Sequence, residues 1–270
     1  MKILKITLSL SVALSSTLLA YDDYNYDNTD SCTQARVLIQ DQTLVNDVIF
    51  NAPTQTKESK SASVQAIKND DISIVNIPYS MEIQDNLKVS FALPIVSTDD
   101  DTGLGDISIG SEYTFGDTSW GFGQNSTKIR YKSTAGDEKK GLGSGESAFT
   151  LTHKIGKQLN DIYLVHGLLS YTFNNGNYGN SYTLVGGVQK PCIFNDKIDT
   201  NIKLSYFSSG ETANLNDETT NIDVMAEFTS DKLVEGIPLG FGLKIPVSSE
   251  IGNNDADKNT LIYFSASKSF

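Results

Sequence analysis

Apolar and polar residues alternate with a period of two in one segment after another from residue 61 to the end of the chain. In the clearest example, 198–206, Ile202 and Leu204 fall in one row and charged or amide residues fall in the other. Successive side chains of a strand point to opposite faces, so each segment predicts a strand with one apolar and one polar face. With the short first segment, 61–68, the pattern predicts twelve strands, an even number as expected of a single-chain bacterial barrel.

The connections between these segments alternate in length, and this alternation favours a membrane barrel. An antiparallel barrel in an outer membrane has short turns on the periplasmic side and long loops outside. We therefore expect an all-β fold, a transmembrane antiparallel up-and-down barrel of about 12 strands with both termini in the periplasm. A soluble β-sandwich also has alternating strands and is the alternative. Short turns are expected at 84–86, 116–119, 159–161 and 194–196, and longer loops at 97–103, 133–145, 174–180, 208–218 and 248–257.

Both ends of the chain fit an exported barrel. Lys2 and Lys5 precede an apolar stretch, 6–20, that ends in Leu-Leu-Ala before an acidic segment, and this order is typical of a cleaved signal peptide. At the other end the last alternating segment stops on Phe270, which resembles the C-terminal assembly signal of outer-membrane barrels. The expected location is the outer membrane of a diderm bacterium. The expected division is a signal peptide at 1–20, a periplasmic segment at 21–60 and the transmembrane barrel at 61–270.

Residues 21–60 follow a different pattern. Between Ala35 and Ile49 apolar residues recur at spacings of three and four, which predicts an amphipathic helix. Packing on the periplasmic rim is the favoured placement, and a plug inside the barrel or a contact with a partner stays open. Cys32 precedes this helix and Cys192 lies beside the expected turn 194–196. Both would then face the same oxidising compartment, so we expect them to form a disulfide.

Composition narrows the function classes. The formal net charge is −12 and no basic stripe offsets it, so nucleic acid is not expected as a partner. His153 and His166 are the only histidines, and neither they nor the cysteines have ligand spacing, so no metal and no cofactor are expected. An outer-membrane hydrolase would need one of these histidines as a base. Neither Thr-His-Lys nor Val-His-Gly resembles a hydrolase motif, so we expect no enzyme.

One stretch is more distinctive than alternation alone. Leu93-Pro94-Ile95-Val96 and an acidic loop precede Gly103-Leu104-Gly105-Asp106-Ile107, and Tyr113-Thr114-Phe115 follows. This order resembles the outer-membrane barrel family associated with the meta-pathway of phenol degradation, and the specific part of the resemblance covers 87–115. The resemblance implies a channel for small, often hydrophobic or aromatic, molecules. Apart from the resemblance, Gly103 and Gly105 would let the expected strand 103–115 bend sharply at the outer rim, with Asp106 pointing inward.

The row opposite the apolar face carries charges that would line the barrel interior. Buried charges must be paired, so most of them are expected to form ion pairs that fill a narrow lumen. The alternative is a charged constriction that selects the solute. The cations at 128, 130 and 132 favour this alternative, because together they would face a carboxylate or phenolate. The expected lumen and selectivity residues are Lys88, Asp106, Glu112, Lys128, Arg130, Lys132, Lys203, Asp223, Glu227 and Lys244.

Taken together, these patterns predict a barrel that gives small solutes passive passage across the outer membrane, and the family resemblance implies that these solutes are hydrophobic or aromatic. Its partners would be outer-membrane lipid and lipopolysaccharide, the barrel-assembly machinery, and the small-molecule solute. Two other functions stay open. One is a closed structural or binding barrel at the cell surface, and the other is an outer-membrane hydrolase.

Overall fold

The computed structural model describes most of the chain from residue 60 onward. The expected signal peptide, the expected helix, Cys32 and Phe270 lie outside the described residues, as does the side chain of Cys192, so these features stay predictions. Within the described part of the chain, no helix is long and apolar enough to cross a bilayer. The described ranges are 60–68, 72–115, 124–159, 163–176, 179–193, 198–210, 218–230, 233–234, 237–251, 254–255 and 260–269.

Twelve long antiparallel strands form one closed barrel, which confirms the fold predicted from alternation. The strands coincide with stretches rich in β-branched and aromatic residues, which favour the extended backbone. They are β1 (Lys60–Lys68), β2 (Ser73–Gln84), β3 (Leu87–Ser97), β5 (Ser108–Phe115), β6 (Gln124–Lys132), β7 (Ser147–Leu159), β8 (Tyr163–Asn175), β9 (Ser181–Ile193), β10 (Ile198–Ser209), β11 (Thr219–Ser230), β12 (Leu239–Ile251) and β14 (Leu261–Ser269).

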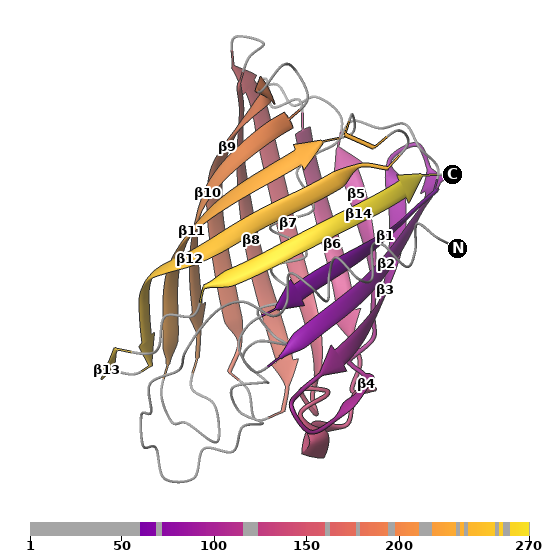
Figure 1. The fold of residues 1–270 in the computed structure, drawn as a ribbon, viewed down its shortest axis with the longest axis vertical. Coiled ribbons are helices and arrows are strands. Elements are labelled where there is room, and N and C mark those ends of the chain that lie inside the picture. Colours follow the sequence, from indigo (N-terminus) through magenta and orange to yellow (C-terminus); the bar gives the residue numbers. More distant parts are fainter. Residues whose placement is uncertain are drawn as a thin grey trace.

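The barrel closes where its first and last strands meet (Figure 1). β1 pairs with β2 on one side and with β14 on the other, with Ser61 opposite Ser269. β14 also pairs with β12, and β12 pairs with β11, so the twelve long strands form a complete ring. A closed ring leaves no sheet edge whose backbone groups would be unsatisfied in hydrocarbon, where each would cost several kcal/mol.

The outer face of the barrel is apolar and the inner face is polar. On β10, Ile202 and Leu204 are 58% and 56% exposed, whereas Asn201 and Lys203 are only 4% and 2% exposed. A soluble sandwich buries its apolar row instead, so this reversal rules out the alternative fold. The apolar row therefore faces the surroundings of the barrel, and the polar row encloses its interior.

The two ends of the barrel differ in their connections. β1 begins and β14 ends at one end, and the tight turn at 85–86 between β2 and β3 lies there too; we name it the turn end. The opposite end, named the loop end, carries longer connections, including 98–107 and 133–146. Three short elements lie at the loop end: β4 (Thr102–Leu104), the 3-10 turn η1 (Glu138–Lys140) and β13 (Asn254–Asp255).

Two groups of aromatic side chains flank the outer apolar band. Toward the loop end, the rings of Tyr131 and Phe149 pack with centroids 4.9 Å apart. Toward the turn end, the rings of Tyr113 and Phe115 pack edge to face at 5.0 Å. Aromatic rings at both rims are typical of barrels whose apolar band spans a bilayer. Further rings at the loop-end rim are Tyr171, Phe173, Tyr182 and Tyr206.

The strand expected over 103–115 is interrupted, which corrects one detail of the prediction. Thr102–Leu104 forms β4, which pairs back onto β3, and β5 starts only at Ser108. The Gly105 N–H donates to the carbonyl of Pro94 at 2.8 Å, and a Cβ at Gly105 would lie 2.7 Å from Val96. Neither Gly103 nor Gly105 has a positive φ. Glycine is therefore needed here for close packing, and the expected bend at the outer rim stays a prediction.

Candidate channel interior

Inward side chains of β8, β10 and β11 form a continuous polar network. His166 Nε2 lies 2.9 Å from Asn201 Oδ1, and the Asn201 amide donates to Glu227 Oε2 at 3.3 Å. The same carboxylate oxygen accepts a hydrogen bond from Lys203 Nζ at 2.8 Å. The sheet register explains this grouping, because Asn201 pairs with Glu227 and Lys203 is two residues further on the same face. The buried carboxylate and ammonium thus neutralise each other.

A second ion pair extends the network onto β12. Asp223 Oδ2 lies 3.1 Å from Lys244 Nζ and accepts a hydrogen bond from Ser205 Oγ at 3.2 Å. All three side chains are buried. The central wall of the interior therefore carries two positive and two negative side chains that pair with each other, so it is strongly polar without a net charge.

Two inward glycines let large side chains lie flat against the wall. A Cβ at Gly187 would lie 2.5 Å from the His166 ring and 3.0 Å from Lys203 Cγ. A Cβ at Gly242 would overlap the ring of Tyr263, which covers this glycine from the neighbouring strand. The missing side chains thus leave space for Tyr263, His166 and Lys203 on the inner wall.

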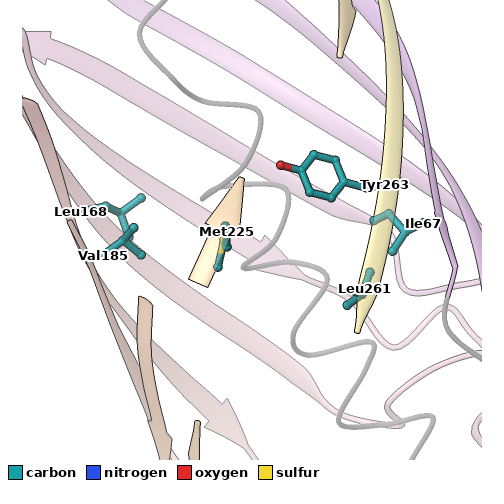
Figure 2. Packing of buried hydrophobic residues seen from close by; sticks show 6 residues of the cluster. All are labelled: Ile67, Leu168, Val185, Met225, Leu261 and Tyr263. Atoms are coloured by element: carbon teal, nitrogen blue, oxygen red, sulfur yellow. The ribbon is translucent and has the colours of Figure 1, made fainter. Parts of the chain in front are cut away.

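Apolar side chains lie at the same height as the ion pairs. Met225 is in register with Lys203 on β10 and with Lys244 on β12, and Leu261 is in register with Lys244 from the other side. The interior thus offers an apolar surface directly beside paired charges. Figure 2 shows the buried apolar group, which comprises Ile67, Leu168, Val185, Met225, Leu261 and Tyr263.

At the loop end, Asp106 binds the connection 133–146. Its Oδ1 accepts a hydrogen bond from the Gly136 N–H at 3.0 Å, and its Oδ2 accepts bonds from the Ser144 N–H at 2.8 Å and Ser144 Oγ at 2.6 Å. Lys132 Nζ lies 3.6 Å from the same Oδ2 and donates to Ser144 Oγ at 2.5 Å. Asp106 is therefore buried at the loop end, and its main partner is a loop.

Toward the turn end, Glu112 is the centre of a smaller polar group. Its Oε1 accepts a hydrogen bond from Ser126 Oγ at 2.7 Å and lies 3.3 Å from Lys154 Nζ. Lys88 on β3 and Lys128 on β6 are the register partners of Glu112 on its two sides. Lys88 is exposed and Lys128 half-buried, so the interior becomes more accessible toward this end.

The structure separates the expected lumen residues into groups. Lys132 is bound to Asp106 and Ser144, so the cations at 128, 130 and 132 do not form a single uncompensated row. The sequence analysis did not name Asn201, Lys154 or Ser144 as functional residues. Alternation places Asn201 and Lys154 in inward rows, whereas Ser144 lies in a loop, where no periodic pattern could have indicated it. The groups are Lys203, Asp223, Glu227 and Lys244 at the centre, Asp106 and Lys132 at the loop end, and Lys88, Glu112 and Lys128 toward the turn end, with Arg130 buried between the last two groups.

The two histidines lie on opposite faces of the barrel wall. His166 faces inward to Asn201, whereas His153 is on the exposed outer face, with its Nδ1 2.9 Å from Thr127 Oγ1. They therefore do not contribute to one site. In the described ranges no three side chains of His, Cys, Asp or Glu converge as a metal would require.

An apolar exterior between two aromatic rims, a polar interior and a closed ring define a transmembrane β-barrel of the outer-membrane type. Solved structures agree on the fold. An outer-membrane channel from Pseudomonas putida F1 superposes with a TM-score of 0.66 at 12% identity, over 82% of this chain and 98% of that one. The KdgM porin gives a TM-score of 0.54 at 12% identity, over 78% and 99% of the two chains.

The same architecture also occurs in a protein of another kind. The translocator domain of the autotransporter NalP from Neisseria meningitidis gives a TM-score of 0.57 at 12% identity, over 88% of this chain and 97% of that domain. No protein-family model matches the chain, and no curated protein sequence matches it. The similar structures therefore establish the fold of this chain. Its function is inferred from the side chains that line the barrel interior.

Proposed function

We propose that this protein is an outer-membrane barrel that gives small solutes passive passage through its interior. The observation that carries the proposal is the reversed distribution of side chains, with apolar residues outside and paired charges inside a closed ring. A polar interior lowers the free energy of a solute inside the bilayer, and the barrel needs no energy source for diffusion. The channel and porin character of two similar folds supports this proposal.

The solute class that fits best is small and carries an apolar or aromatic body with a polar group. Met225 and Leu261 lie directly beside the Lys203–Glu227 ion pair, so the central wall combines apolar and polar side chains, as such a solute would require. The resemblance of 87–115 to the barrel family associated with phenol degradation points to the same class. The central side chains are buried, so the route is narrow and large solutes are excluded.

The inward charges are the proposed selectivity elements. Lys128 and Arg130, on the inward row of β6, are the candidates for contact with an anionic solute. If they select anions, the Lys128→Gln/Arg130→Gln variant passes anionic aromatic solutes more slowly than the parent and neutral ones equally fast. Equal rates for anions in liposome swelling contradict this role.

The direct test of the proposed function is liposome swelling with the purified full chain. Phenol, benzoate and a series of sugars of increasing size are compared with protein-free liposomes. Faster swelling with the small aromatic solutes than with the sugars supports the proposal, and swelling no faster than in protein-free liposomes contradicts it.

A closed structural or binding barrel is the second candidate, because the central inward side chains are buried. Deletion of residues 21–57 separates the two candidates when single-channel conductance is measured. Conductance in the full chain supports the channel. Silence in both proteins supports the closed barrel, and conductance only after the deletion implicates the deleted residues as a plug.

The remaining features are proposed with the function. We propose a signal peptide at 1–20, a periplasmic segment at 21–60 and a barrel from 61 onward, with both termini in the periplasm. Phe270 would serve recognition by the assembly machinery, and lipopolysaccharide would surround the loop end. The turn end and the barrel's two terminal strand ends lie together, which supports this orientation.

A further inference from the structure

The connection 133–146 folds into the loop end of the barrel; we name it the strap. Its residues 141–144 are all buried, with Leu142 5% exposed and Ser144 0% exposed. Leu142 packs with Ile72, Ile74 and Val96, of which the last two belong to the inward rows of β2 and β3. The strap therefore crosses from β6 to the inner side of β2 and β3 and occupies part of the mouth.

A single carboxylate, that of Asp106, holds the buried part of the strap. It accepts three hydrogen bonds from the strap, from the N–H groups of Gly136 and Ser144 and from Ser144 Oγ. Lys132 balances its charge and also donates to Ser144 Oγ. Without the carboxylate, the N–H groups of Gly136 and Ser144 would lose their acceptor together, and Ser144 Oγ would keep only the Glu146 carbonyl, so the contact forms or breaks as a unit.

Glycines leave the room that this contact requires. A Cβ at Gly103 would lie 2.8 Å from Leu142 Cδ1, and one at Gly105 would lie 3.2 Å from the Leu142 carbonyl oxygen. A Cβ at Gly143 would lie 2.6 Å from Asp106 Oδ1. The Gly-Leu-Gly-Asp sequence at 103–106 therefore forms the seat of the strap, with two glycines for space and the aspartate for binding.

The outer part of the strap is exposed to solvent. Residues 137–140 are exposed, and Lys140 forms an exposed ion pair with Asp101 at 3.4 Å. Exposed ion pairs contribute between about 0 and 1 kcal/mol. The contacts of Asp106 and Leu142 thus decide whether the strap stays in the mouth.

We propose that the strap is a gate over the loop-end mouth, and that Asp106 is the residue that holds it closed. Release of the strap widens the entrance and admits larger solutes. This inference rests on the proposed passage of solutes through the barrel. It assigns the strap a role in size selection, while the central ion pairs act deeper in the interior.

The test uses the full chain with Asp106→Asn and, as a milder variant, Ser144→Ala, and it has two independent readouts. Hydrogen exchange of the peptide spanning 133–146 reports the strap without reference to transport. With the carboxylate removed, exchange of these amides is expected to be about tenfold faster or more, because hydrogen bonds to a charged group are lost. In liposome swelling, the size cut-off is expected to shift toward larger sugars.

Asp100→Asn is the matched control, since it removes an exposed carboxylate from the connection that also carries Asp106 and is expected to change neither readout. Unchanged exchange in both Asp106→Asn and Ser144→Ala overturns the inference. Faster exchange with an unchanged size cut-off, in a protein that passes solutes, overturns the gate and leaves the proposed function standing. If exchange shows that the strap is released but the protein passes no solute at all, both the gate and the proposed function are contradicted.

Discussion

Lys203 Nζ and Glu227 Oε2 lie 2.8 Å apart on the inner wall, and their side chains are only 1% and 3% exposed. A charged pair this deeply buried is tolerated because Asn201 also donates to the carboxylate. The pair joins β10 to β11 at the height where Met225 contributes an apolar surface. Polar and apolar contacts are thus interleaved at the centre of the barrel.

Removing one partner of this pair is expected to destabilise the barrel strongly. Glu227→Gln leaves a buried ammonium without its counter-charge, and such losses cost about 3–5 kcal/mol. Lys203→Met leaves the opposite charge uncompensated and is expected to cost a similar amount. Urea unfolding in lipid vesicles measures both. The Lys203→Met/Glu227→Gln double variant is expected to recover much of the loss, and strictly additive losses would contradict the coupling.

Gly242 and Gly186 are expected to respond in opposite ways to alanine. A Cβ at Gly242 overlaps the Tyr263 ring, so Gly242→Ala is expected to cost roughly 1–3 kcal/mol through overpacking. At Gly186 nothing lies within 4 Å of an added Cβ, so Gly186→Ala is expected to be neutral or stabilising. Tyr263→Leu should relieve the overlap in Gly242→Ala. The midpoints of unfolding in lipid vesicles measure the stability of both variants. Equal effects of the two alanine substitutions would contradict the explanation by packing against Tyr263.

Leu204 and Leu233 are equally exposed, at 56%, but lie in different places. Leu204 is near the middle of β10 on the outer face, and Leu233 lies in the connection between β11 and β12 at the turn end. If the outer band contacts hydrocarbon, Leu204→Arg costs about 2–4 kcal/mol, and Leu233→Arg costs little. The free energy of folding into vesicles gives the comparison. Equal costs would contradict the membrane position assigned to the band.

The expected disulfide between Cys32 and Cys192 can be tested by counting free thiols. Both cysteines would face an oxidising compartment, and a bridge would tether the segment before β1 to the end of β9. The non-reduced protein should then contain no free thiol, and reduction should release two. Two free thiols in the denatured, non-reduced protein would refute the bridge.

The inward position of many side chains of the barrel interior can be predicted from alternation along single strands. Lys203, Asp223, Glu227 and Lys244 sit in inward rows because strand side chains alternate, and that period is visible in the sequence. Alternation alone does not predict which of these charged side chains form ion pairs. The pairing depends on the register between strands, which places Lys203 beside Glu227 and Lys244 beside Asp223. One residue of slip would bring together other partners.

The sequence by itself determined the barrel class and the two faces of most strands, because these follow from a local period and from the order of turns and loops. Only the tertiary structure decided that Asp106 holds the strap through Ser144 and Gly136, residues 30 and more positions away, and that Gly105 serves close packing. A strand carries its own period, whereas a loop has none. Its partners are set by the way in which neighbouring strands and their connections pack in three dimensions, which brings Asp106 to Gly136 and Ser144.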